Sequence, residues 1–200
     1  MPKAIPRSPS TRTEHKERTR DALRSAALRL FATKGFDDTT ADEIAEQAGV
    51  SGRTFFRYFP TKESVLWAGE RQWVEAFIDR YPAQPEALDD VDAMCATIIE
   101  LAPGLGPARR SLLLYQKAVA SSVTLRGRER DHSQEDIEKM SEAIATRRGL
   151  DGVDESCLLL AAVGMLAYRR ALDSWLRGPG DDDLAVVIAD EFDALTRNFT

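Results

Sequence analysis

The segment from Thr39 to Leu66 constrains the fold of this chain more than any other part of its sequence. Thr40 stands just ahead of an apolar-periodic run, and Glu43 follows three residues later, a spacing that predicts a capped helix start. Gly49 is suited to the left-handed turn that ends a helix, because it has no side chain. Ser51 is then a candidate N-cap for a second short helix. The sequence therefore predicts two short helices joined by a tight turn.

The second helix is expected to end at Tyr58, because Pro60 pushes the residue before it out of helical geometry. Two short helices joined by a glycine-containing turn are the layout of a helix-turn-helix, whose second helix enters the DNA major groove. Arginine can hold guanine through two hydrogen bonds, and threonine can bond a base or meet a thymine methyl group. A plain pair of surface helices remains an alternative at this point. The base-contacting candidates at the start of the second helix are Ser51, Gly52, Arg53 and Thr54.

The same segment resembles the DNA-binding signature of TetR-family (tetracycline-repressor-type) transcriptional regulators, and it reads TTADEIAEQAGVSGRTFFRYFPTKESV. Matching features are the Thr-Thr opening, the Ile-Ala-x-x-Ala-Gly-Val-Ser middle, the Tyr58–Phe59 pair and the Thr-Lys-Glu run that begins at Thr61. The similarity extends back to Glu14 and covers roughly the first third of the chain. The resemblance implies an all-helical repressor dimer with a ligand-binding C-terminal domain.

The resemblance also assigns roles to single residues. Tyr58 and Lys62 occupy positions where family members contact DNA phosphates. Phe56 departs from the tyrosine usual at its position and loses a hydroxyl contact, although an apolar contact with a thymine methyl group can remain. The predicted DNA-binding residues are Thr40, Ser51, Gly52, Arg53, Thr54, Phe56, Arg57, Tyr58 and Lys62.

The distribution of charge suits this prediction better than the net charge of −6 does. Residues 1–64 hold 12 basic and 9 acidic side chains, whereas the remainder holds 15 and 24. A positive DNA-facing module on an acidic body discourages unproductive orientations on the duplex. Residues 1–12 are expected to form a disordered basic tail, which is either inert or an arm that reaches DNA.

Helical periodicity without any strand pattern predicts an all-α fold of about nine helices. After the tail, residues 13–60 are expected to form a three-helix DNA-binding domain with the helix-turn-helix. Residues 61–200 are expected to form a six-helix C-terminal ligand-binding and dimerisation domain. Its helices are predicted at 61–80, 88–102, 108–125, 133–149, 154–177 and 182–199, with a charged loop at 126–131.

Small residues in the penultimate helix are compatible with dimerisation through the last two helices, which is what the resemblance implies. They allow helices to approach closely, either across a subunit interface or within one subunit; they are Ala161, Ala162, Gly164, Ala167 and Ala171. Two recognition helices spaced one DNA turn apart favour a homodimer on a palindromic operator.

A ligand pocket in the C-terminal domain is implied by the resemblance, and its candidate residues are mostly aromatic. They are Trp67, Trp73, Phe77, Tyr115, Met140, Tyr168, Arg169 and Trp175. Each aromatic residue could equally be plain core. Arg169 and Arg170 either anchor an anionic ligand, such as an acyl thioester, or pair with the acidic residues Asp173 and 181–183.

Other classes of protein find little support in the sequence. No apolar run approaches the length of a membrane helix, the N-terminus does not resemble a secretory signal, and Cys95 and Cys157 are expected to be reduced thiols. His15 and His132 lack neighbours at metal-ligand spacing, and no phosphate loop or nucleophile motif occurs. We therefore expect a cytoplasmic, non-enzymatic repressor without metal or cofactor that a small molecule releases from DNA. The alternative is a DNA-binding regulator that answers to a partner protein or to no ligand.

Overall fold

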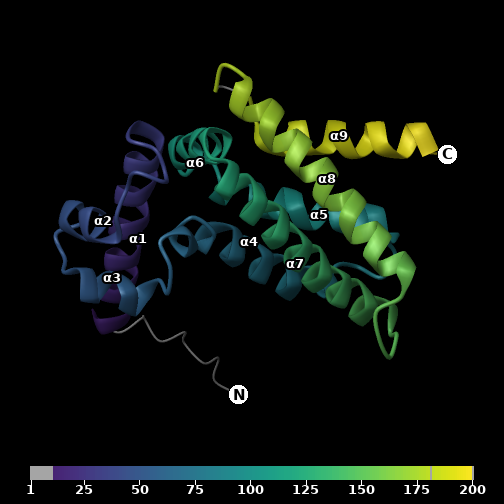
Figure 1. Ribbon diagram of the computed structural model, residues 1–200. Coiled ribbons are helices and arrows are strands. Elements are labelled where there is room, and N and C mark those ends of the chain that lie inside the picture. The colour runs from purple at the N-terminus through teal and green to yellow at the C-terminus, as the bar shows by residue number, and fades with distance from the viewer. Residues whose placement is uncertain (1–10, 181, 200) are drawn as a thin grey trace. The chain divides into compact units, whose positions relative to one another are not determined.

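The computed structural model describes residues 11–180 and 182–199 of the chain (Figure 1). This part of the chain contains nine α-helices and three short 3-10 turns, and it has no strand. The all-α prediction, with three helices followed by six, is therefore confirmed. Most of the predicted basic tail, residues 1–10, lies outside the described residues. Helix α1 already includes Thr11 and Arg12, which the sequence pattern places in the tail.

The chain divides into two compact units, with the boundary between Ala68 and Gly69. The domain boundary that we expect between residues 60 and 61 remains a prediction. The boundary between the two compact units lies eight residues further along the sequence. The N-terminal unit contains α1 (Thr11–Thr33), α2 (Ala41–Gln47), α3 (Gly52–Tyr58) and the 3-10 turn η1 (Glu63–Val65). Figure 1 shows α2 and α3 beside the long helix α1.

The apolar stripe of α1 forms the core of the N-terminal unit. Leu23, Ala27 and Phe31 recur at helical spacing and are buried, so they provide one continuous face against which the shorter helices pack. Phe55 of α3 is fully buried, and its ring lies 5.7 Å from that of Phe59, centroid to centroid. The two short helices are therefore held by tertiary packing, which helices of this length need.

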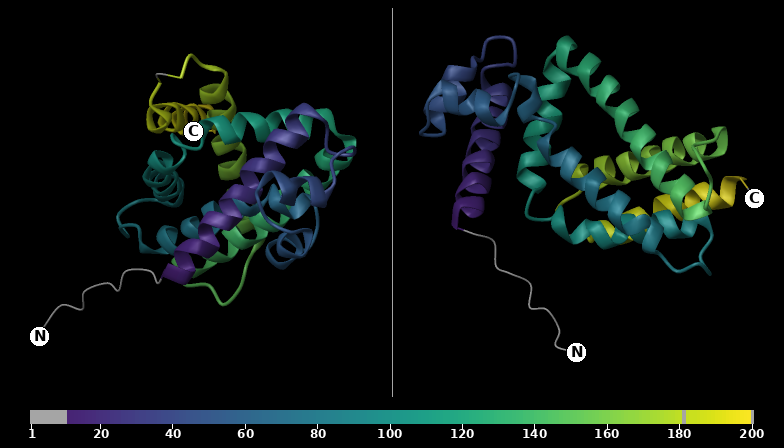
Figure 2. Two further views of the ribbon diagram at one scale, coloured as in Figure 1. Left: turned by 90° about the vertical axis from the view of Figure 1, so that its left-hand side faces the viewer. Right: turned by 90° about the horizontal axis from the view of Figure 1, so that it is seen from below.

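The C-terminal unit is a bundle organised around α8. It contains α4 (Ala68–Arg80), α5 (Asp90–Leu101), α6 (Arg109–Ser121), α7 (Val123–Arg148), α8 (Glu155–Arg177) and α9 (Leu184–Phe199), with the 3-10 turns η2 (Tyr81–Ala83) and η3 (Ala102–Gly104). Helix α8 packs against α7 and α9 and also contacts α5 (Figures 1 and 2). At the crossing with α5, a Cβ atom on Gly164 would lie 1.8 Å from Sδ of Met94, so a larger residue here would force the buried Met94 side chain to shift.

Two predicted element boundaries are wrong. The segment predicted as one helix over 61–80 is irregular around η1 and becomes α-helical only at Ala68. The predicted loop at 126–131 is instead part of α7, because arginine and glutamate are good helix formers that a solvated helix face accommodates. The break between helices falls earlier, at Ser122, whose hydroxyl accepts a hydrogen bond from the backbone N–H of Leu125.

Two arginines of the C-terminal unit close breaks between helices. The guanidinium of Arg109 lies 5.3 Å from the centroid of the Trp175 ring and donates to the carbonyl oxygens of Leu176 and Gly178 at the end of α8. Arg147 lies 5.7 Å from the centroid of the Tyr81 ring. It donates to three carbonyls of the connection between α4 and α5, those of Gln84, Pro85 and Leu88. Each cation thus rests on an aromatic ring and supplies donors to backbone oxygens that no helix satisfies.

Candidate DNA-binding surface and ligand site

Helix α2 begins with the predicted capping box. The hydroxyl of Thr40 accepts from the backbone N–H of Glu43 at 3.2 Å, and the Glu43 carboxylate accepts from the Thr40 N–H at 2.8 Å. Lys34 also pairs with this carboxylate. The hydrogen bond from Lys34, followed by that from the Thr40 backbone, lowers the pKa of Glu43 to about 2. The start of α2 is therefore held by an ionised carboxylate at neutral pH.

The turn between α2 and α3 has the geometry that the sequence predicts. Gly49 has a φ of 72°, in the left-handed region, and the N–H of Val50 donates back to the Ala45 carbonyl at 2.9 Å. Ser51 caps α3 by accepting from the N–H of Thr54 at 3.2 Å. This turn fixes the direction in which α3 leaves α2, and with it the placement of the recognition-helix candidates.

Helix α3 buries one face and leaves the other in solvent. Phe55 is fully buried, whereas Ser51, Arg53 and Arg57 are exposed. Phe56 is 54% exposed, although an aromatic side chain of its size is usually covered. The helix therefore presents a basic surface with one aromatic side chain, and the predicted base contacts lie on it.

The nine predicted DNA-binding residues all lie within the N-terminal unit, and each is exposed or half-buried. Gly52 stands close to α2, since an added Cβ would lie 2.0 Å from Oδ1 of Asp42. The Arg57 guanidinium carbon lies 5.3 Å from the centroid of the Tyr58 ring. The roles in DNA binding assigned to these nine residues remain predictions.

The Lys62 ammonium is engaged by the backbone of the protein itself. Its Nζ donates to the carbonyl oxygens of Phe36 at 2.6 Å and of Thr39 at 2.9 Å. The same atom lies 4.1 Å from the centroid of the Phe36 ring. The sequence resemblance had suggested a phosphate contact only, and no local pattern could have pointed to partners 23 and 26 residues away.

The predicted ligand residues do not all gather in one place. Trp67 belongs to the N-terminal unit, and the other seven belong to the C-terminal unit. Within the latter, Trp73 stacks on Tyr168 with ring centroids 4.2 Å apart and lies 6.0 Å from Phe77. Trp175 is held separately, since its indole N–H donates to the Asp182 carbonyl.

A polar cluster lies next to the aromatic stack. Arg169, the residue after Tyr168, pairs with Glu70 at 3.1 Å and so connects α8 to the first turn of α4. The Tyr115 hydroxyl donates to Glu129 at 3.0 Å. Burial, and then the charge of Glu70, raise the pKa of Tyr115 well above its usual value.

Asp136 of α7 belongs to the same cluster and is only 6% exposed. Burial is the main cause that raises its pKa to about 6, and the Glu70 charge adds to it, while Lys139 and Arg169 act in the opposite direction. Met140 follows one turn later and is fully buried. Sequence reasoning missed Glu70 and Asp136, although their spacing from Trp73 and Met140 places each on an apolar helix face.

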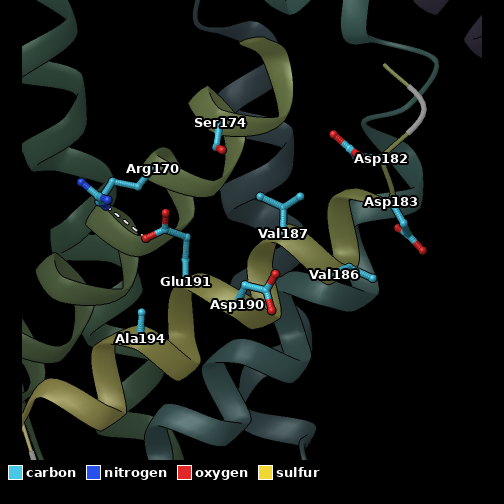
Figure 3. A pocket seen from close by; sticks show the side chains of 9 residues that line it. All are labelled: Arg170, Ser174, Asp182, Asp183, Val186, Val187, Asp190, Glu191 and Ala194. Atoms are coloured by element: carbon cyan, nitrogen blue, oxygen red, sulfur yellow. Dashed lines mark hydrogen bonds and ion pairs between the residues drawn. The ribbon is translucent and has the colours of Figure 1, made fainter. Parts of the chain in front are cut away.

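Both arginines that the sequence offered as anion anchors are already paired. Arg169 binds Glu70, and Arg170 binds Glu191 of α9 at 3.0 Å. A groove of about 650 Å³ between α8 and α9 lies beside Arg170, and Figure 3 shows the carboxylates around it. They belong to Asp182, Asp183, Asp190 and Glu191. The groove is therefore acidic and does not suit an anionic ligand.

Within 11–180 and 182–199, no group of His, Cys, Asp and Glu side chains has the arrangement of a metal site. Over that same part of the chain, every helix is too short or too polar to cross a bilayer. Cys95 and Cys157 are free thiols.

Comparison with known proteins identifies the helix-turn-helix unit. The family model described as "Bacterial regulatory proteins, tetR family" matches residues 23–68, which span α2, α3 and the end of α1. A TetR-family transcriptional repressor, FadR of Thermus thermophilus, was solved in complex with lauroyl-CoA. It matches 90% of this chain and 95% of its own length, with a TM-score of 0.55 and 25% identity. Residues 23–68 thus match the TetR family, and the chain is similar along most of its length to a TetR-family repressor.

Two other proteins are similar to parts of the sequence or to the fold. The transcriptional regulator TcmR of Streptomyces glaucescens is 37% identical over 92 residues, which are 46% of this chain and 41% of TcmR. The chain thus covers less than half of the length of this relative. FadR of Bacillus subtilis was solved in complex with stearoyl-CoA, and its structure matches 90% of this chain and 99% of its own length at 18% identity. The TM-score of 0.60 shows that the two proteins share the fold.

Proposed function

We propose that this protein is a sequence-specific DNA-binding transcriptional regulator of the TetR family, and that it acts as a repressor which a small molecule releases from its operator. The observation that carries the proposal is the capped α2–turn–α3 unit with Arg53, Arg57 and Phe56 in solvent on α3. A recognition helix needs this combination of a rigid support and an exposed basic face. The relatives named above are transcriptional regulators, which supports the same conclusion.

In the proposed complex, the first turn of α3 reads bases and the surrounding residues hold the phosphates. Arg53 is the base-reading arginine, because it is exposed one residue after the helix begins. Ser51, Gly52 and Thr54 lie beside it, and Phe56 can contact a thymine methyl group. The phosphate contacts come from the N-cap of α2 and the end of α3, at Thr40, Arg57 and Tyr58.

The proposed ligand site lies in the C-terminal unit, around the Trp73–Tyr168 stack and the Glu70–Arg169 pair. Aromatic walls with a few polar groups are typical of small-molecule sites. The two FadR neighbours were solved with acyl-CoA ligands, which makes an acyl thioester the first probe to use. Because Arg169 already has a carboxylate partner, an anionic ligand would have to compete with Glu70 for it.

A homodimer is the proposed assembly, with α8 and α9 as the contact surface. Leu159 and Leu166 lie two helical turns apart on α8 and are 66% and 60% exposed, and Val186 of α9 is 57% exposed. Large apolar side chains exposed along two adjacent helices indicate a protein contact. The small residues Ala161, Gly164, Ala167 and Ala171 are buried within the subunit, so they serve packing inside it.

We further propose that the protein acts in the cytoplasm on chromosomal DNA and catalyses no reaction. A dimer would place two α3 helices on successive major grooves of a palindromic operator. Neither a metal nor a cofactor is needed for this role, which depends on binding alone.

Selection from a randomised DNA pool with the purified protein tests the proposal. The expected product is a two-fold symmetric site with half-sites about one helical turn apart. Calorimetry with lauroyl-CoA, with and without that operator, then tests release. Linkage requires DNA to weaken ligand binding by the factor with which the ligand weakens DNA binding.

The outcomes separate the candidate functions. Recovery of random sequence would overturn DNA-specific regulation. Recovery of an operator whose affinity does not respond to lauroyl-CoA, or to any small molecule that mass spectrometry finds bound to the purified protein, would favour control by a partner protein instead.

A further inference from the structure

The connection between α1 and α2 is short and irregular, and helical hydrogen bonds do not satisfy its backbone oxygens. Helix α1 ends before Gly35, which has a φ of 99°, and α2 begins after its cap at Thr40. Thr39 is 1% exposed, and its hydroxyl donates to the Gly35 carbonyl at 2.7 Å. Within the connection the Phe36 carbonyl accepts a long hydrogen bond of 3.3 Å from the Thr39 N–H, so a stronger donor from another part of the chain would stabilise it further.

Lys62, which follows α3 in the chain, supplies such donors to the connection between α1 and α2. Its ammonium approaches the carbonyl oxygens of Phe36 and Thr39 at 2.6 and 2.9 Å, and the Phe36 ring lies 4.1 Å away, centroid to Nζ. A lysine ammonium has three N–H donors, and two are committed here. Hydrogen bonds from a charged donor are stronger than those between neutral groups, so these two bonds should hold the lysine side chain in one position.

These contacts connect the two ends of the helix-turn-helix. Lys62 follows α3, whereas the carbonyls that it binds directly precede α2 and its capping residue Thr40. The ammonium therefore fixes where α2 begins relative to where α3 ends. Two of its three donors are thereby directed into the protein, whereas a lysine that served only as a phosphate anchor would direct them into solvent.

We infer that Lys62 is a positioning residue of the DNA-binding unit, which locks the α1–α2 connection and so sets the spacing of Thr40 and α3 for DNA. This inference rests on the proposed DNA-binding function, but the contacts that carry it are internal to the N-terminal unit. It predicts that Lys62 does not exchange these carbonyls for phosphate when DNA binds.

A substitution tests the inference through two readouts. Lys62→Met keeps the aliphatic stem and removes the donors, and Lys16→Met is the matched control, because Lys16 is an exposed lysine on α1. Without DNA, hydrogen exchange of the Thr39 amide, which donates to the Phe36 carbonyl, should become at least about tenfold faster in Lys62→Met and stay unchanged in Lys16→Met.

With DNA, operator affinity of Lys62→Met should fall by about tenfold or more, while affinity for random duplex should fall much less. The slope of log K against log salt should remain that of the wild type, because no phosphate contact is lost. A loss of roughly 1.8 in this slope, about 0.9 for each of two subunits, would overturn the inference and establish a phosphate anchor. Unchanged hydrogen exchange would overturn it as well.

A measurement on the unmodified protein keeps the inference testable if Lys62→Met does not fold. The Nζ resonance of Lys62, observed by nitrogen NMR, should show the same hydrogen-bonded ammonium in the free and operator-bound protein. A shift on operator binding with coupling to phosphorus would contradict the inference. If the wild type shows no sequence preference, the proposed function fails, but exchange and the free-state resonance still decide the role of Lys62.

Discussion

At the scale of single residues, exposure separates the side chains that can read DNA from those that support the fold. Arg53 projects into solvent from the first turn of α3, whereas Phe55 two residues later is fully buried. Substitution of Arg53 should therefore alter DNA recognition without unfolding the protein. Substitution of Phe55 should instead destabilise the fold.

Arg53→Ala is expected to weaken operator binding by about 1–3 kcal/mol and to relax the preference at one base position in each half-site. The thermal unfolding midpoint should not change, because the side chain is exposed. Selection from a randomised pool, run beside Arg177→Ala as an exposed charge-matched control on α8, measures both effects. An unchanged base preference would remove Arg53 from the base-reading set.

Asp136 should make stability depend on pH in a direction unusual for a carboxylate. Its pKa in the folded protein is about 6, above the ordinary 3.8, so the folded state holds the proton more tightly than the unfolded state does. The free energy of unfolding should therefore fall as pH rises through 4 to 6, and the full cost should be present above that window. Glu70 and Glu135 oppose ionisation, and Arg169 and Lys139 favour it.

Asp136→Asn should accordingly stabilise the protein by roughly 1–3 kcal/mol at pH 7 and by little at pH 4. Urea unfolding at several pH values measures this difference. Asp131→Asn, an exposed change on the same helix, serves as the control and should leave the pH profile of the wild type. A constant difference between Asp136→Asn and wild type across the range would show that the carboxyl does not titrate as described.

At the scale of elements, two helical glycines should respond to the same substitution with opposite signs. Gly164→Ala on α8 would push a Cβ against Met94, which is fully buried, and should cost about 1–3 kcal/mol. Gly127→Ala on α7 meets nothing within 4 Å and should stabilise by about 0.5–1 kcal/mol. Denaturant unfolding of the two variants checks the pair, and equal effects would contradict the close α5–α8 crossing.

Elements determined by neighbouring residues could be predicted from the sequence, and those determined by distant contacts could not. The capping box of Thr40 and the turn at Gly49 depend on residues a few positions apart and could therefore be predicted. The structure confirms both. The break at Ser122 was misplaced because the charged run after it has no apolar stripe, yet it continues as α7. The partners of Lys62 and Arg169 lie 23 to 99 residues away, beyond any periodic pattern.

The candidate sites divide in the same way. The exposed face of α3 was predictable, because this helix is short and the face follows from the burial of Phe55, while the DNA contacts assigned to it remain predictions. Most of the predicted ligand residues are aromatic side chains on apolar helix faces, and core residues fit the same description. Only the folded chain distinguishes the Trp73–Tyr168 stack from Trp175, which is held by Asp182 and Arg109.

At the scale of the whole molecule, the exposed apolar face of α8 and α9 should decide both assembly and DNA affinity. Leu166→Glu places a charge on this face and should convert the proposed dimer to a monomer, which sedimentation would show. Operator affinity should fall by about 10²–10⁴, because the second half-site contact is no longer intramolecular. Val123→Glu is the control, since Val123 is 77% exposed on another helix.

A Leu166→Glu variant that remains dimeric would move the contact surface away from α8. One that becomes monomeric but keeps full operator affinity would show that a single head suffices, and the palindromic operator would then be withdrawn from the proposal.

The contacts of Lys62 have a practical consequence for building hybrid regulators from this chain. A graft that joins its first 60 residues to a foreign body ends at Pro60 and leaves behind the ammonium that closes the α1–α2 connection. The transplanted DNA-binding unit would then depend on the side chain that the recipient protein supplies at position 62. A junction after Ala68, where the first compact unit ends, carries Lys62 along and should give a head that keeps its own operator preference in a new body.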